Sequence, residues 1–161
     1  ASYLVLVRDF KAEQAAKFVA IYYAGITIGR FISGFVSLKL NNQALVKLGQ
    51  GLIVLGIVTL ILPFQASILP GFFLVGFGCA PIFPSLLHNT PHNFGKTNSE
   101  SIMGLQMAFA YIGITLMPFI YGKLASYIGF SSLIWFLIII LSIKIYMNIR
   151  LNKRVLTQQY T

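Results

Sequence analysis

Charged side chains are scarce in this chain of 161 residues: Asp, Glu, Lys and Arg make up 9%, and only 3 residues are acidic. Soluble domains carry about 25% charged residues, so too few are present to cover a surface exposed to water. Cysteine occurs once, as Cys79, which excludes a disulfide scaffold. At 57% hydrophobic residues the chain is also too apolar for disorder. These features leave an integral membrane protein with several spans.

Motifs for catalysis are missing as well. The sequence has no phosphate loop and no dinucleotide-binding glycine motif, and Cys79 has no convincing nucleophile partners. His88 and His92 have the four-residue spacing of a metal pair, but Pro91 lies between them and is expected to break the helix that would align them. The sequence therefore predicts no enzyme, no metal site and no cofactor.

The net charge of +9 does not indicate a nucleic-acid-binding protein. The Lys and Arg residues are dispersed between apolar runs and form no continuous basic segment. This distribution is typical of loops that flank membrane spans. The lipid bilayer, and not nucleic acid, is the predicted partner.

Five apolar runs have about the 20 residues that a helix needs to cross a bilayer. The expected spans are residues 18–38, 48–66, 70–87, 102–121 and 130–148. Residues 1–7 are too short to span and are expected to be the end of a further helix, and residues 149–161 form a polar tail. The runs do not alternate between apolar and polar residues, as transmembrane strands do. The predicted fold is all-α and integral to the membrane.

The Lys and Arg residues also predict the orientation, because cytoplasmic loops are enriched in them. One side of the membrane would hold Lys39, Lys47, Lys96, Arg150, Lys153 and Arg154, with Lys144 nearby. The other side would hold Arg8, Lys11, Lys17 and Lys123. We therefore expect the C-terminal tail to be cytoplasmic, in a plasma (inner) membrane.

The first span has a stripe of small residues, Gly25, Gly29 and Ser33, at intervals of four. Such a stripe lets a second helix approach closely. Glycine inside a helix lowers helix stability by up to about 1 kcal/mol relative to alanine. Close packing of a second helix would explain why glycine stands at these positions.

A second face of the same span carries Tyr23, Thr27 and Arg30. A charged arginine inside a span costs about 2.5–3.5 kcal/mol on insertion scales, so Arg30 is expected to face protein or water. One interpretation is a substrate contact. The other is that Arg30 extends its side chain to the nearer membrane surface.

The third and fourth spans carry further candidates. Pro81 and Pro84 each remove a helical hydrogen bond and predict a kink or a broken helix, which either lines a cavity or is a bent packing helix. Gln106 could hydrogen-bond a polyol or an opposing helix. Gln50, near the end of the second span, is interpreted as a packing residue.

Three segments, Tyr22–Phe35, Gly78–Gly95 and Gly104–Pro118, resemble the C-terminal half of a major facilitator superfamily transporter. The fucose-permease-like branch of sugar–proton symporters is the closest fit. The resemblance implies twelve helices in two halves, with residues 1–7 ending helix seven, the five spans as helices eight to twelve, and the N-terminal half missing.

The resemblance also implies that cavity positions lie on helices eight, ten and eleven, with Tyr23, Thr27, Arg30 and Gln106 as the substrate-binding candidates. The family's proton-coupling carboxylates would lie in the missing half. In the superfamily's loop motif, Gly34 and Lys39 match but Leu38 replaces the acidic residue.

The predicted function is therefore part of a secondary active transporter for a sugar or similar small polar solute, working by alternating access. The alternative is a small membrane protein without transport activity, or an accessory subunit that binds a partner through the stripe at Gly25 and Gly29. A membrane enzyme is disfavoured by the missing catalytic groups.

Overall fold

The computed structural model describes residues 2–7, 9–62 and 64–159, and the chain is 90% helical. The elements are α1 (Ser2–Val7), α2 (Ala12–Val36), α3 (Asn42–Ile61), η1 (Gln65–Ser67), α4 (Ile68–Cys79), α5 (Ile82–Phe94), α6 (Lys96–Ile128), η2 (Phe130–Ser132) and α7 (Leu133–Gln159). Within the described ranges there is no strand. Five segments are long and apolar enough to cross a membrane: Ala12–Val36, Asn42–Ile61, Gln65–Phe94, Asn98–Ile128 and Phe130–Leu151. The predicted all-α membrane fold with five spans is confirmed.

Most helices extend beyond the apolar runs that predicted them. α2 begins at Ala12, before the expected start of the first span at residue 18, and α6 continues past the expected end of the fourth span at residue 121 as far as Ile128. The segment expected as a polar tail is helical as far as Gln159. Hydropathy marks only the part of a helix that lies in hydrocarbon, whereas backbone hydrogen bonding continues until capping groups or a turn end it.

The second span is shifted relative to its prediction. α3 begins at Asn42 because the Oδ1 atom of Asn41 accepts a hydrogen bond from the backbone N–H of Ala44 at 2.8 Å, which caps the helix. The helix ends at Ile61, and Leu62 is extended, with ψ 139°. The residue before a proline disfavours the helical region, and Leu62 precedes Pro63.

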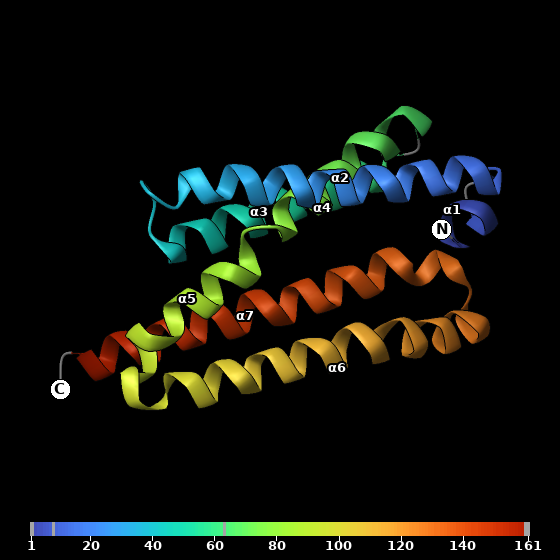
Figure 1. Cartoon of the computed structure of the whole chain (residues 1–161). Helices are drawn as coiled ribbons and strands as arrows, with labels where there is room; N and C mark the ends of the chain where they lie inside the picture. The colour runs from blue at the N-terminus through green and yellow to red at the C-terminus, as the bar shows by residue number, and fades with distance from the viewer. Residues whose placement is uncertain (1, 8, 63, 160–161) are drawn as a thin grey trace.

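Glycines end α5 and α6. Gly95, between α5 and α6, has φ 77°, and Gly129, after α6, has φ 83°. These left-handed conformations cost glycine nothing sterically. At each site the chain reverses direction, so that α6 follows α5 and α7 follows α6 (Figure 1).

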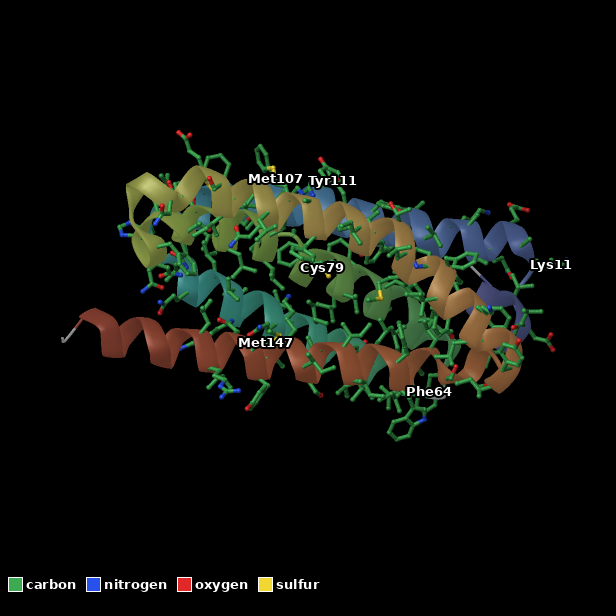
Figure 2. All side chains as sticks on the ribbon, turned by 90° about the horizontal axis from the view of Figure 1, so that it is seen from below. Lys11, Phe64, Cys79, Met107, Tyr111 and Met147 are labelled. Atoms are coloured by element: carbon green, nitrogen blue, oxygen red, sulfur yellow. The ribbon has the colours of Figure 1, made fainter. Side chains whose placement is uncertain are left out.

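The helices form two groups joined by α4 and α5. Figure 1 shows α2 and α3 above and α6 and α7 below, with α4 packed against the upper pair and α5 descending to α6. Seen from below in Figure 2, α2 and the first half of α6 lie toward one edge, and α3 and α7 lie toward the other. The second half of α6 crosses to the edge where α7 begins. The broken helix α4–α5 therefore runs through the middle of the bundle.

The break falls at Ala80 and Pro81, between α4 and α5. Pro81 lacks the N–H that would continue α4, while Pro84 lies in the first turn of α5, where no intrahelical donor is needed. The expectation that Pro91 would also break the helix is wrong, because α5 continues through it to Phe94. A proline inside a membrane helix is tolerated where neighbouring groups satisfy the released backbone carbonyl.

Glycines on α2 make the contact with α4. A Cβ atom added at Gly25 would lie 2.6 Å from the carbonyl oxygen of Phe73, and one at Gly29 would lie 2.7 Å from Cβ of Ala80. From the opposite side, Gly76 of α4 rests on the backbone carbonyl of Tyr22. Ser33, the third residue of the stripe, is half-buried, and its hydroxyl donates to the carbonyl of Arg30 at 3.0 Å.

Close contacts between glycine and backbone also join α4 to α3. Gly49 and Gly78 face one another, because an added Cβ on either would lie within 2.6 Å of the other's carbonyl oxygen. Near the other end of this contact, Gly56 lies against Val75, and Gly71 lies against Leu60. α4 is thus held between two helices through backbone contacts that leave no room for a side chain.

Two apolar clusters complete the core. One contains Leu4, Ala15, Leu60 and Ile68, and joins α1, α2, α3 and α4. The other contains Ile53, Ile57 and Ile82, against which α7 packs. The most apolar 18-residue windows of α6 and α7 contain no buried residue at all. These helices therefore present apolar faces to lipid or to further protein.

Close packing at Gly29 is tested by adding a single methyl group. Gly29→Ala should lower the stability of the bundle by about 1–3 kcal/mol, because α4 must move away to admit the methyl group. The control is Gly34→Ala on the same helix, where an added Cβ meets nothing within 4 Å. Gly34→Ala should be neutral or stabilise by up to about 1 kcal/mol, through helix propensity alone. Thermal unfolding in detergent compares the two, and equal effects would show that α2 and α4 are not in backbone contact.

Candidate functional site

The polar face predicted on α2 is exposed. Tyr23 is 61% exposed, and Thr27 and Arg30 are exposed beside it, on the side of α2 away from the buried Gly25 and Gly29. The Thr27 hydroxyl donates to the carbonyl of Tyr23 at 3.0 Å, so it is satisfied within the helix. This polar face points away from the α2–α4 contact.

Arg30 has no acidic partner among the described side chains. The one ion pair found within the described ranges joins Lys17 and Glu13 at 2.8 Å, in the first turns of α2 and far along the helix from Arg30. The guanidinium group therefore has donors available for a ligand or for an acid on another chain segment.

Gln106 lies on α6 and is hydrogen-bonded across to α5. The hydroxyl of the buried Thr90 lies 3.0 Å from Oε1 of Gln106 and 3.2 Å from the carbonyl oxygen of Leu86. Gln106 therefore joins two helices, the second of the two roles considered for it. The structure does not bring it next to Tyr23, Thr27 and Arg30, although α2 and α6 lie toward the same edge of the bundle (Figure 2).

Gln106 also lines a small cavity of about 30 Å³ at the end of the bundle where α3 begins and α7 ends. Its polar lining consists of uncharged side chains: Gln43, Asn89, Thr90, Asn93, Gln106 and Asn148. A cavity of this volume has space for about one or two water molecules. It is too small for a sugar.

A larger cavity, of about 760 Å³, adjoins it and shares part of its wall. α3 contributes Val46 and Gln50, α5 contributes Leu86, and α7 contributes most of the remainder, including Lys144 and Met147. The lining is predominantly apolar. We name this space, between the first turns of α3 and the middle turns of α7, the α3–α7 cavity; Met147 is labelled in Figure 2.

Gln50 is the unusual residue of this wall. Its side chain is 7% exposed, and its amide nitrogen is buried with no hydrogen-bond partner among the described residues. Leaving a buried donor unsatisfied costs about 1–3 kcal/mol. From the sequence, Gln50 is interpreted as a packing residue and Lys144 as a cation that flanks a span, so neither is predicted to line a cavity. For Lys144 the sequence does contain a signal, a cation inside an apolar run, since intramembrane ionisable residues are rare without a function.

The described residues contain no group of three side chains suited to bind a metal ion. His88 and His92 lie on the same helix, α5, without a third ligand in that part of the chain that the structure describes. The fold and its polar groups therefore define a multi-span membrane protein that can bind ligands by hydrogen bonds.

Comparison with known families identifies this class more closely. A sequence model of the Major Facilitator Superfamily matches residues 2–151. The match covers most of the chain, so the chain belongs to the Major Facilitator Superfamily, whose members are membrane transporters rather than enzymes. No curated protein and no solved structure matches the chain.

Proposed function

We propose that this chain is the C-terminal half of a secondary active transporter for a sugar or a similar small polar solute, of the fucose-permease-like branch. The observation that carries the proposal is the exposed polar face of α2, Tyr23, Thr27 and Arg30, in a chain of this superfamily. Exposed polar groups within a membrane span need a polar partner. A solute cavity shared with a second, N-terminal half provides one.

The chemistry of this face suits a hydroxyl-rich solute. The guanidinium group of Arg30 offers up to five hydrogen-bond donors in a fixed plane, and the Tyr23 ring can cover the apolar face of a sugar. Hydrogen bonds in a dry cavity reject analogues that lack a hydroxyl group. Gln106, on α6, is the further candidate. It would contact the solute only in another state of the transport cycle, because here its Oε1 atom is hydrogen-bonded to Thr90 and the cavity that it lines is too small for a sugar.

Alternating access would require the two halves to rock about the shared cavity. The edge that carries α2 and α6 is where we place the N-terminal half. Any proton coupling would rely on carboxylates of that half, because the acids of this chain are Asp9, Glu13 and Glu100, which lie outside the central parts of the spans.

The test uses the intact transporter in membrane vesicles, with uptake of a labelled hexose such as fucose normalised to the amount of inserted protein. Arg30→Gln should reduce uptake by about ten- to a hundredfold, since a hydrogen bond to a charged group contributes about 1.5–3 kcal/mol. Arg30→Lys keeps the charge but loses the planar arrangement of donors, so uptake should also fall sharply.

A side chain that only reaches the membrane surface would give a different result, because lysine then replaces arginine freely. Wild-type uptake by Arg30→Lys would therefore rule out a solute contact at this position. Ile28→Leu, at an exposed position on the same helix but outside the face that carries Tyr23, Thr27 and Arg30, is the matched control and should leave uptake unchanged.

We propose further that the loop before α3 and the C-terminal end of α7 face the cytoplasm of a plasma (inner) membrane, because that side is richer in Lys and Arg. Single cysteines at Asn42 and Gln158, in a Cys79→Ser background, should resist a membrane-impermeant thiol reagent in intact cells and react after permeabilisation. Labelling of both positions from outside intact cells would reverse the orientation.

A further inference from the structure

The α3–α7 cavity has no place in the proposed transport cycle. It lies between α3 and α7, toward the edge of the bundle opposite to the α2 and α6 edge (Figure 2). Its lining is predominantly apolar, which does not suit a hydroxyl-rich solute. At about 760 Å³ it is nevertheless large enough for a substantial part of an organic molecule.

The cavity exists because α3 and α7 separate along their length. In the first half of α7, Ile134, Leu137, Ile138 and Leu141 pack against the cluster around Ile53 and Ile57 of α3. Ile140, and beyond these contacts Ile143, Lys144 and Met147, line the open space opposite Val46 and Gln50. An apolar opening on the outer side of a membrane bundle is filled by lipid chains, because no water is present in hydrocarbon to fill it.

Charge is confined to one end of this space. Lys144 lies within the candidate span Phe130–Leu151, and Arg150 lies one residue before its end. At 1.5 Å per residue, Lys144 is about 10 Å from the end of the span. The long stem of a lysine at this depth allows its ammonium group to reach toward the interface, which is the level of lipid phosphates.

Gln50 supplies an independent observation. Its amide nitrogen is buried in the same wall without an acceptor among the described residues. The terminal torsion of glutamine is broad, so a small rotation presents the N–H groups to an acceptor inside the cavity. Two cations and an unused amide donor favour an occupant that accepts hydrogen bonds and carries negative charge.

We propose that the α3–α7 cavity is a binding site for an anionic phospholipid. Its acyl chain lies along Leu86, Ile140, Ile143 and Met147, and its phosphate is held by Lys144, with Arg150 at the rim and Gln50 donating to a phosphate or ester oxygen. Basic pockets between membrane helices are suited to such head groups. The lipid would fill the space where α7 is separated from α3, and its contacts with both helices would hold α7 against the bundle.

The test compares lipids by native mass spectrometry and thermal unfolding of the full chain in detergent, and needs no transport. Added phosphatidylglycerol should be retained and should raise the unfolding temperature. Phosphatidylcholine with the same acyl chains has no net charge, so it should be retained less and should raise the unfolding temperature less. Inorganic phosphate should have no effect. Equal effects of the two lipids, or an effect of phosphate alone, would overturn the proposal.

Variants locate the site. Lys144→Gln should weaken phosphatidylglycerol binding about fivefold, the contribution of one lysine near an anionic surface, and Lys144→Arg should keep most of it. Gln50→Glu, which has nearly the same shape and adds negative charge, should weaken it at least as much as Lys144→Gln. The control is Lys39→Gln, which removes the same charge from an exposed position at the same end of the bundle. Equal losses from Lys39→Gln and Lys144→Gln would show general surface attraction and overturn the assignment.

Discussion

The close approach of α4 to α2 and α3 is the contact on which the rest of the structure depends. Membrane helices gain little from apolar burial, because lipid is as apolar as their side chains. Their association relies on backbone proximity, and glycine permits it at Gly25, Gly29 and Gly76 on one side of α4, and at Gly49 and Gly78 on the other. Van der Waals contact between backbones then replaces the missing hydrophobic effect.

This contact also determines which faces stay open. Because Gly25 and Gly29 turn one face of α2 inward, Tyr23, Thr27 and Arg30 are turned outward. The break at Ala80 and Pro81 directs α5 away from α2 and toward α6. α6 and α7 attach through fewer buried residues and leave apolar faces exposed. The two parts of the bundle therefore differ in role. The tightly packed α2, α3 and α4 form a fixed support, and the loosely packed α6 and α7 present surfaces that bind lipid or further protein.

The helical membrane fold could be predicted from the sequence because length and hydropathy are local properties. The helix ends could not, since they depend on capping by Asn41 and on the left-handed turns at Gly95 and Gly129. The partner of Gln106 could not be predicted either, because Thr90 reaches it only after α5 and α6 pack together. The sequence indicates only a packing role for Gln50, and only the packing of α3 shows that its amide nitrogen is buried with no hydrogen-bond partner among the described residues.

The most direct test of this packing is a disulfide between α2 and α4, formed in membranes by a chain with cysteines at Gly29 and Ala80 in a Cys79→Ser background. An added Cβ at Gly29 would lie 2.7 Å from Cβ of Ala80, and a disulfide holds its Cβ atoms at about 3.8 Å, so a small separation of the helices suffices. The pair should oxidise nearly completely under a mild oxidant, whereas cysteines at Gly34 and Ala80 should not. Absence of the first disulfide, or equal yields from both pairs, would contradict the contact between α2 and α4.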